Sequence, residues 1–269
     1  MAEAIPLITL LTDFGLHDHY VGVMKGVIYN IHPQARVVDI CHEVRPQDIL
    51  QAAFLLKASY SYFPKRTLHV VIVDPEVGTV RRPILVSTES YYFIAPDNGV
   101  LSYIYQTEPV GEVRELTASH YFLSRISQTF HGRDIFAPVA AWLSRGVAPS
   151  SLGDLITDYK RLNIPLPTLL KEDILKGRIL YIDRFGNLVS NITRQDFTAH
   201  LEKSPNKRFI IRIGDRNLTR LCQSYAEGNE KELIALFGSS DHLEFSLNKG
   251  NAAKTLGIHV GAEVLVKIA

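Results

Sequence analysis

The hydrophobic periodicity of this chain changes near residue 170, and this change constrains the fold more than any other feature. Before it, two kinds of segment alternate. Apolar runs typical of buried strands occur at residues 5–12, 36–41 and 67–73. Between them, residues 20–31 and 48–63 have apolar side chains at helical spacing. Strand, helix, strand, helix, strand in this order predicts a largely parallel sheet with helices on its faces.

After residue 170 the chain consists of short apolar runs separated by glycine, asparagine and aspartate. The strand-like runs are RILYID, NLVSNIT, RFIIRI, LIALFG, HLEFSL and EVLVKI. Strands at this spacing predict an antiparallel barrel or sandwich, and the prolines of residues 163–168 are typical of a linker. We therefore expect an α/β protein with an N-terminal three-layer α/β catalytic domain, residues 1–166, and a C-terminal antiparallel β-barrel or sandwich domain, residues 167–269.

Overall charge and cysteine spacing exclude several classes of protein. Lysine plus arginine number 29 and aspartate plus glutamate 28, so the chain lacks the basic surface that nucleic acid or an anionic membrane requires. No apolar run approaches the ~20 residues of a membrane span, and the N-terminus lacks the regions of a signal peptide. Cys41 and Cys222 lie outside any CxxC pattern, which indicates reduced thiols and a cytoplasmic protein.

The first candidate binding segment is TDFG, residues 12–15, at the end of the opening strand. Ligands of open α/β sheets bind outside the carboxyl ends of the strands, where Asp13 can accept hydrogen bonds from both hydroxyls of a ribose. The alternative is an aspartate that caps the next helix. Asp18 is expected either to hold a cationic group of a ligand or to cap that helix. A metal site of His17, Asp18 and His19 is the weaker alternative, since no second cluster completes it, and we expect no metal.

The second segment is VDPEVGTVRRP, residues 73–83, which begins where the third buried strand ends. Asp74 leaves this strand, a proline and a glycine turn the chain, and Arg81 and Arg82 follow. The pattern predicts a loop with a charge pair directed at the strand-end crevice. A structural bridge that pins the loop explains the same spacing equally well.

The third segment is TFHGRDIFAP, residues 129–138, which places His131, Gly132, Arg133 and Asp134 just before a helix. Gly132 lets a ligand approach the backbone closely, and the start of the helix offers unpaired amides. Asp134 is also explained as a favourable charge at the helix N-terminus.

The fourth segment is DRFGNLVSN, residues 183–191. Phe185 is suited to stack on a base, and Asp183 and Asn187 are suited to bind a small zwitterion. An ordinary hairpin turn explains the same residues. The GxGxxG, GxxxxGK[ST] and GxSxG motifs are absent, so the sequence does not support a Rossmann dinucleotide site, a P-loop or a hydrolase nucleophile elbow.

In this order the segments resemble one family, the S-adenosyl-L-methionine (SAM) hydroxide adenosyltransferases, or SAM hydrolases, which are related to the SAM-dependent fluorinases and chlorinases. The resemblance spans nearly the whole chain, and TFHGRDIFAP is its most specific part. The other matching segments are LLTDFG (10–15), VVDICHEVRPQDI (37–49), VDPEVGTVRR (73–82), FIAPDNGVL (93–101), IDRFGNLVSNI (182–192) and NKGNAA (248–253).

The resemblance implies hydrolysis of SAM to adenosine and L-methionine, by attack of an activated water or hydroxide on the 5′ carbon of the ribose. It implies no metal and no cofactor beyond the substrate. It also implies a homotrimer with active sites between the N-terminal domain of one subunit and the C-terminal domain of the next. The catalytic residues of the family fall on Asp74, Arg81 and His131.

The substrate-binding residues follow from the same resemblance. The ribose-binding aspartate falls on Asp13, the methionine-binding residues fall on Asp183 and Asn187, and Phe185 and Tyr225 fall near the adenosyl group. The remaining expected contacts with SAM are Asp18, Gly132, Ser239, Asn251 and Ala252.

Three positions separate this chain from the halogenating relatives. Those relatives carry a tyrosine where Asp74 stands, and the fluorinases carry a tyrosine and a serine where His131 and Gly132 stand. The chain therefore keeps the hydrolase set. Glu76 departs from the family, in which this position is often glycine, and adds a carboxylate beside the catalytic group.

The implied reaction needs a water placed in line with the carbon–sulfur bond. The leaving group is a neutral thioether that requires no general acid, and positioning alone can supply roughly 7–11 kcal/mol of barrier reduction. We expect Arg81 to lower the pKa of Asp74, which then orients the water, and His131 to accept the proton.

Two other functions stay open from the sequence. One is adenosyl transfer to a halide, which the carboxylate of Asp74 opposes by charge repulsion in a dry site. The other is a SAM- or adenosine-binding protein without turnover, because a charge network can be purely structural.

Overall fold

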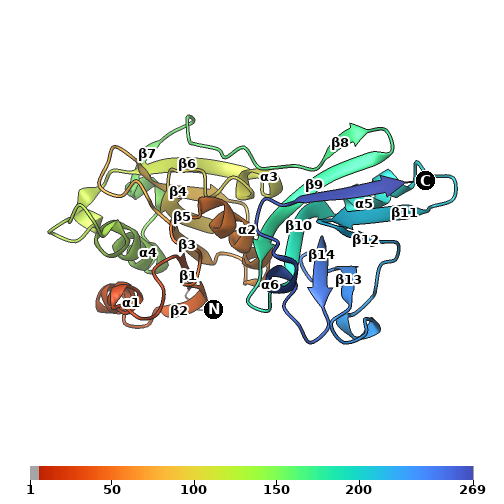
Figure 1. Ribbon diagram of the computed structural model, residues 1–269. Helices are drawn as coiled ribbons and strands as arrows, with labels where there is room; N and C mark the ends of the chain where they lie inside the picture. The colour runs from red at the N-terminus through yellow and green to blue at the C-terminus, as the bar shows by residue number, and fades with distance from the viewer. Residues whose placement is uncertain (1–5, 269) are drawn as a thin grey trace. The chain divides into compact units, whose positions relative to one another are not determined.

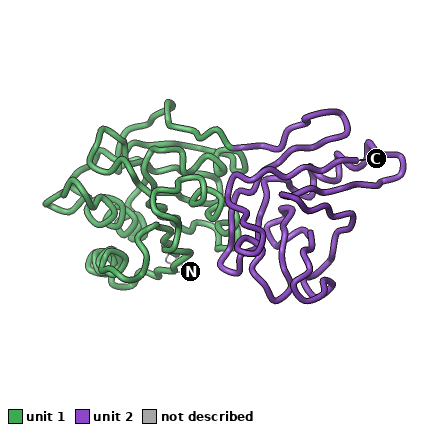
Figure 2. Tube along the Cα trace, in the orientation of Figure 1, with its two compact units in different colours: residues 1–164 green, residues 165–269 purple. Residues whose placement is uncertain are grey.

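The computed structural model describes residues 6–268 of the chain. The chain divides into two compact units, unit 1 (Met1–Ile164) and unit 2 (Pro165–Ala269), shown in Figure 2. No helix in the described part of the chain has both the length and the apolar character needed to cross a membrane.

Unit 1 is built on a seven-stranded sheet with the order β2-β1-β3-β5-β4-β6-β7 (Figure 1). Neighbouring strands run parallel from β2 through β1 and β3 to β5, and antiparallel from β5 onward. The predicted largely parallel sheet is therefore confirmed. The strands are β1 (Leu7–Thr12), β2 (Arg36–Cys41), β3 (Leu68–Ile72), β4 (Pro83–Thr88), β5 (Tyr92–Pro96), β6 (Val110–Leu116) and β7 (Gly153–Leu155).

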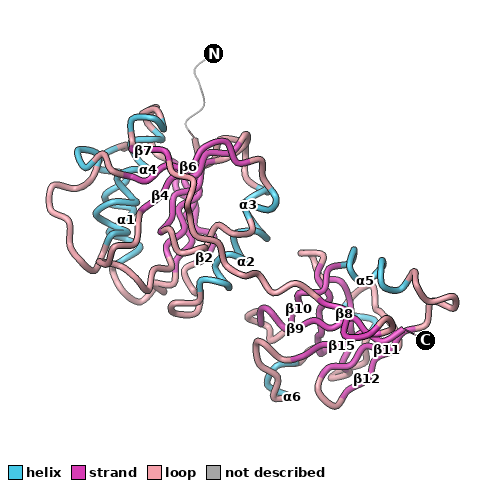
Figure 3. Tube along the Cα trace, turned by 90° about the horizontal axis from the view of Figure 1, so that it is seen from above, coloured by secondary structure: helices cyan, strands magenta, loops and turns pink. Residues whose placement is uncertain are grey.

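Helices cover both faces of this sheet and make the three expected layers. Figure 3 shows α1 (Tyr20–Ile31) and α4 (Ala137–Ser144) on one face, and α2 (Ile49–Ser59) and α3 (Ile104–Thr107) on the other. Met24 and Ile28 of α1 are fully buried in one core with Leu10 and Ile72 of the sheet, as the helical spacing of the sequence predicts. Single 3₁₀ turns occur at Tyr60–Tyr62, Ser119–Tyr121 and Pro149–Ser151.

Unit 2 is built on an antiparallel sheet with the order β12-β11-β15-β9-β10-β14-β13, and β8 pairs with β9. Side chains from β9, β11, β13, β14 and β15 enter one apolar core, so the sheet curls around it in the predicted barrel-like way. The strands are β8 (Thr168–Lys171), β9 (Ile174–Ile182), β10 (Leu188–Thr193), β11 (Phe209–Ile213), β12 (Arg216–Leu218), β13 (Leu233–Phe237), β14 (His242–Leu247) and β15 (Glu263–Ile268).

Two short helices of unit 2 were not expected from periodicity. Helix α5 (Arg194–Leu201) begins with a capping box, in which Thr193 and Asp196 each bond the other's backbone amide. Helix α6 (Ala252–Leu256) begins at Asn251, whose side chain accepts the Lys254 amide. Each is too short for its apolar spacing to stand out.

A buried asparagine fixes the end of β3, where the candidate site begins. Asn98 Nδ2 donates to the Val73 carbonyl at 2.8 Å, and its Oδ1 accepts the Val100 amide at 3.1 Å. Gly99 follows with φ of +91°, a conformation that favours glycine. The turn after β5 therefore holds the residue that precedes Asp74.

We expect Asn98→Ala to lower the free energy of unfolding by about 1–3 kcal/mol, because two buried backbone groups lose their partner. Urea unfolding measures this change. The matched control is Asn30→Ala on the exposed side of α1, which should stay within about 0.5 kcal/mol of wild type. Equal effects of the two substitutions would contradict the assigned role of Asn98.

Candidate active site

The predicted catalytic residues meet at the carboxyl end of the parallel strands. Asp74 follows β3, Asp13 follows the adjacent β1, and His131 precedes the helical segment that leads into α4. Arg81 returns to this edge at the end of the loop that starts with Asp74. The fold therefore brings Asp74 and Arg81 together with His131, which lies far from them in the sequence.

Arg81 binds Asp74 through both of its carboxylate oxygens. Arg81 Nε donates to Asp74 Oδ1 at 3.1 Å, and Arg81 Nη2 forms a short hydrogen bond with Asp74 Oδ2. Their side chains are only 1% and 5% exposed. This is the planar two-point contact that guanidinium and carboxylate groups form best, here almost removed from solvent.

His131 completes the group through the same guanidinium. Its Nδ1 lies 3.0 Å from Arg81 Nη2. Because a guanidinium nitrogen only donates, Nδ1 accepts, and a neutral His131 carries its proton on Nε2. The ring nitrogen with a free lone pair is thus already engaged with Arg81.

Burial sets the protonation of this group. It raises the pKa of Asp74, and the charge and hydrogen bonds of Arg81 oppose this rise without reversing it. Arg81 does lower the pKa of Asp74, but the expected net result, a pKa below the ordinary value, is wrong because loss of solvent outweighs the ion pair. Burial and then the charge of Arg81 lower the pKa of His131, which favours its neutral form.

One nitrogen of Arg81 is left for another partner. Within residues 6–268, Arg81 Nη1 is buried and has no hydrogen-bond acceptor. The guanidinium also lies over the Phe136 ring, 5.4 Å from its centre. A buried cationic donor without an acceptor is costly, so this atom is suited to hold an oxygen of a bound water or ligand.

The backbone at His131 has an unusual form that positions the ring. Gly132–Phe136 makes one π-helical turn before α4 begins, a distortion found often at functional sites. A Cβ atom at Gly132 would lie 3.1 to 3.4 Å from the side chains of Phe130, Met24 and Ile72, so a larger residue fits poorly. Asp134 accepts the Ser127 amide at 2.7 Å, which gives it a structural role in this loop.

The residues around the opening loop are placed as follows. Asp13 Oδ2 accepts the Gln47 amide at 2.8 Å, so it does not cap α1. Asp18 is exposed just before α1, whose N-cap residue His19 makes no side-chain cap bond. Among residues 6–268, no three His, Cys, Asp or Glu side chains are grouped as metal ligands, and His17, Asp18 and His19 are no exception.

Glu76 does not extend the catalytic group. Its carboxylate faces Lys160, with 3.3 Å between Oε2 and Nζ, at an exposed position. Its backbone contributes instead, because the Glu76 amide bonds Asp74 and opposes the rise in that residue's pKa. The departure from the family at this position therefore leaves the side chains of the group unchanged.

In unit 2, Asp183 organises the hairpin turn between β9 and β10. Its Oδ1 accepts the backbone amides of Phe185 and Asn187, each at 2.9 Å, and its Oδ2 accepts Asn187 Nδ2 at 2.9 Å. The turn alternative is therefore correct for this segment, and the turn also presents its side chains to a cavity.

That cavity, which we call the aromatic pocket, has a volume of about 540 Å³. Phe185 and Tyr225 are 75% and 45% exposed and form part of its wall. Its lining residues are Asp183, Phe185, Asn187, Tyr225, Ser246, Leu247, Asn248, Lys249 and Gly250. Four predicted substrate-binding residues thus line one cavity.

Residues 251–253 (Asn-Ala-Ala) pack against the turn between β9 and β10. The Ala253 amide donates to the Gly186 carbonyl at 3.0 Å, and a Cβ atom at Gly186 would lie 2.1 to 2.3 Å from side-chain atoms of Asn251. Ala252 is fully buried at the start of α6. Ser239 lies in the turn between β13 and β14 and is not among the residues that line the aromatic pocket.

Sequence reasoning missed two residues of β14 that support this pocket. Ser246 Oγ donates to Asn187 Oδ1 at 2.6 Å, and Tyr225 OH donates to Glu244 Oε1 at 2.7 Å. The available signal was the alternation of polar and apolar residues in HLEFSL. That pattern normally indicates a solvent-facing side, whereas all six residues are buried.

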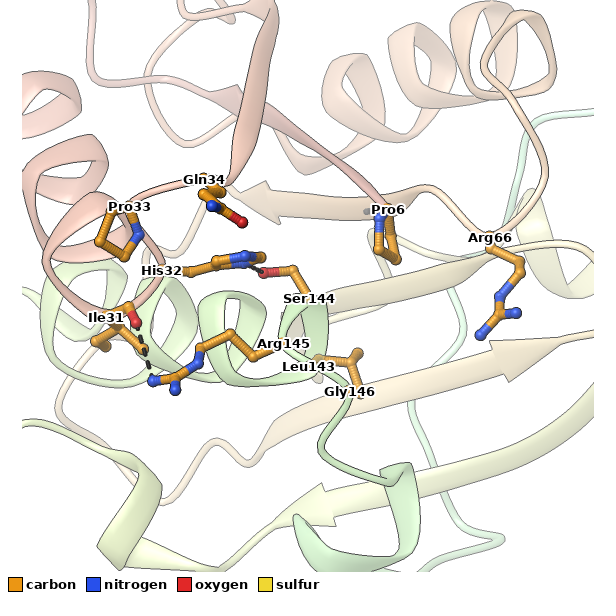
Figure 4. A pocket seen from close by; sticks show the side chains of 10 residues that line it. All are labelled: Pro6, Ile31, His32, Pro33, Gln34, Arg66, Leu143, Ser144, Arg145 and Gly146. Carbon is orange, nitrogen blue, oxygen red and sulfur yellow. Dashed lines mark hydrogen bonds between the residues drawn. The ribbon is translucent and has the colours of Figure 1, made fainter. Parts of the chain in front are cut away.

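A second cavity, of about 640 Å³, lies at the end of the parallel strands opposite the candidate site (Figure 4). None of the predicted site residues lines it. Helices α1 and α4 both end there. Arg145 Nη1 donates to the Ile31 carbonyl at 3.1 Å, and His32 Nδ1 lies 2.7 Å from Ser144 Oγ. These side chains satisfy the ends of the helices, which gives the cavity's polar groups a structural explanation.

The chain is similar to proteins of known activity. It is 32% identical to the (R)-S-adenosyl-L-methionine hydrolase of Methanocaldococcus jannaschii, with 95% of this chain and 94% of that protein covered. It is 31% identical to the (R)-S-adenosyl-L-methionine hydrolase of Thermus thermophilus, with 94% and 96% covered. A fluorinase of Actinopolyspora mzabensis is more distant at 25% identity, with 97% of each chain covered.

The crystal structure of an uncharacterized conserved protein from Thermotoga maritima matches with a TM-score of 0.89 and 36% identity, covering 97% of this chain and 100% of that chain. Residues 8–153 match the SAM hydroxide adenosyltransferase N-terminal domain, and residues 177–265 match the C-terminal domain. With these matches over most of its length, the chain belongs to the SAM hydroxide adenosyltransferase family.

Proposed function

We propose that this protein is an enzyme that hydrolyses SAM to adenosine and L-methionine. The observation that carries the proposal is the buried Asp74–Arg81–His131 group, with its unpartnered Arg81 Nη1, in a member of this family. The names of the similar hydrolases specify (R)-SAM. We therefore propose the (R) configuration at the sulfonium sulfur as the preferred substrate.

In this reaction a water oxygen bonds to the 5′ carbon of the ribose as the carbon–sulfur bond breaks. The electron pair of that bond stays on sulfur, so methionine leaves as a neutral thioether and no acid is needed. Arg81 Nη1 is placed to hold the attacking oxygen, and its positive charge stabilises the hydroxide character that this oxygen gains as its proton leaves. The water's proton must go to a nearby base.

We assign that base to Asp74 rather than to His131. The lone pair of His131 Nδ1 already faces Arg81, and its Nε2 carries the proton in the neutral ring. Burial raises the pKa of Asp74, which makes its carboxylate a stronger base than an exposed one. His131, whose ring also bonds the Ser127 backbone, then helps to orient the water. Asp74 also disfavours a halide as nucleophile, because two anions repel each other in a buried site.

Substrate binding is proposed to use both units. Asp13 binds the ribose hydroxyls, Asp183 and Asn187 bind the methionine part, and Phe185 and Tyr225 contact the adenosyl group. The remaining proposed contacts are Asp18, Gly132, Ser239, Asn251 and Ala252. We further propose a cytoplasmic location, which the free thiols of Cys41 and Cys222 support.

The protein incubated with SAM should release adenosine and L-methionine without added halide, and chromatography of the products checks this. We expect the (R) epimer to be consumed faster than the (S) epimer. Asp74→Ala should fall below about a hundredth of the wild-type rate, since it removes the base. SAM that binds and stays intact would indicate a binding protein, and 5′-chloro-adenosine in chloride would indicate a halogenating enzyme.

The choice of base predicts different effects of two conservative substitutions. Asp74→Asn should lower kcat by about 10²–10⁴, whereas His131→Asn should cost about tenfold because it only weakens orientation of the water. The wild-type rate should fall as pH drops through the raised pKa of Asp74, because the protonated acid cannot accept the proton. Steady-state rates against pH check both points. If the fall in rate at low pH persists in Asp74→Asn and disappears in His131→Asn, the base is His131 and not Asp74.

We also propose the homotrimer that the resemblance implies, with each active site completed by a neighbouring subunit. Asp74→Ala and Asp183→Ala are then each inactive alone. In a co-expressed mixture, about a quarter of the sites should combine an intact N-terminal domain from one variant with an intact C-terminal domain from the other, and activity should return to about a quarter of wild type. Light scattering gives the mass of the assembly. A mixture no more active than the separate variants, or a monomeric mass, would contradict this part of the proposal.

A further inference from the structure

A buried carboxyl group in β14 has no part in the mechanism above. Glu244 lies in the middle of the strand with 6% of its surface exposed. Tyr225 OH donates to its Oε1 at 2.7 Å. Its Oε2 packs against the backbone of Gly238, where a Cβ atom would lie 2.4 Å away. The hydrogen bond to Oε1 therefore holds the carboxylate, and Oε2 occupies space that a side chain at position 238 would need.

The surroundings of Glu244 do not favour a negative charge. Burial raises its pKa, the hydrogen bond from Tyr225 opposes this rise, and the negative charge of Asp183 adds to it. An apolar side chain of similar volume would avoid the cost of desolvating a carboxylate. Glu244 is therefore better explained by what it holds than by its contribution to stability.

What Glu244 holds is a wall of the aromatic pocket. Tyr225 lies outside the sheet, in the short 3₁₀ turn Tyr225–Glu227, and its side chain is 45% exposed. A tyrosine in such a turn has freedom to change direction. Its hydrogen bond to Glu244, 2.7 Å long, has good geometry and ties the ring to a strand.

The same face of β14 also holds the polar wall of the pocket. Side chains alternate along a strand, so Glu244 and Ser246 point to one side. Ser246 Oγ donates to Asn187, which donates in turn to Asp183. One strand face thus positions both an aromatic and a polar part of the pocket lining.

We propose that Glu244 is a positioning residue for substrate binding, which fixes the Tyr225 ring against the adenosyl group. The proposal rests on the proposed function in taking adenosine as part of the ligand. A ring that is already ordered loses less conformational freedom when the ligand binds, so affinity rises. Because the contact is present before and during reaction, it affects KM and leaves kcat nearly unchanged.

The test compares Glu244→Leu, Tyr225→Phe and the double variant in the full-length protein. Calorimetry gives the Kd for adenosine, and steady-state assays give KM and kcat for SAM. Each single substitution should raise Kd and KM about tenfold with kcat within about twofold. The double variant should lose no more than either single variant, because both remove the same hydrogen bond.

Two controls separate positioning from general damage to β14. Glu244→Gln keeps an acceptor oxygen for Tyr225, so its Kd should stay within about threefold of the wild-type value. Phe245→Leu disturbs the core on the opposite face of the strand, and should lower the melting temperature without changing Kd. If Glu244→Leu does not fold, comparing the Kd of Tyr225→Phe with that of Glu244→Gln still tests whether the hydrogen bond between Tyr225 and Glu244 strengthens binding.

Several outcomes would overturn the role of Glu244. These are losses that multiply in the double variant, an unchanged Kd in Tyr225→Phe, or the same rise in Kd for Phe245→Leu. The two proposals also fail separately. Adenosine binding that weakens as expected in a protein without SAM turnover supports Glu244 and refutes hydrolysis. Turnover with an unchanged KM and Kd in Glu244→Leu refutes Glu244 alone.

Discussion

The buried pair of Arg81 and Asp74 is the interaction on which the rest of the site depends. Removing two charges from water costs several kcal/mol per ion, which only a well-formed contact offsets. The two-point geometry provides that contact, and the turn at Asn98 fixes the strand end from which Asp74 leaves. With Arg81 held in this way, its Nη2 determines which nitrogen of His131 carries the proton.

The sequence was sufficient to predict what depends on strand ends and on ordered motifs. Parallel strands bring their carboxyl ends to one edge, so Asp13 and Asp74 were expected near each other once β1 and β3 were recognised. His131 was placed with Asp74 and Arg81 only by the resemblance to the family, because its position in the sequence does not indicate which residues it contacts. In unit 2, the pattern around Asp183 and Asn187 predicted a hairpin turn, because Gly and Asn mark turns strongly, and only the resemblance added a binding role.

Properties that depend on burial could not be predicted in this way. The rise in the pKa of Asp74 comes from loss of solvent, whereas the sequence showed only a nearby arginine. Glu244 and Ser246 were missed because alternation in β14 indicates a solvent-facing side, and nothing local shows that a turn covers it. Helix α5 is a different case, since Thr193 and Asp196 form a recognisable capping box that periodicity alone overlooks.

The distribution of charge fits a substrate whose positive charge disappears during reaction. A carboxylate near a sulfonium stabilises the bound substrate more than the transition state, in which the charge is already fading, so such contact strengthens binding and slows the chemical step. In unit 1 the guanidinium of Arg81 balances Asp74, and burial favours a neutral His131, which leaves the reacting group close to neutral. Outside this group, the carboxylate of Asp183 lies at the aromatic pocket of unit 2. In the residue roles that we propose, attraction of the cationic substrate and catalysis of its cleavage belong to different residues, so that tight binding need not oppose the reaction.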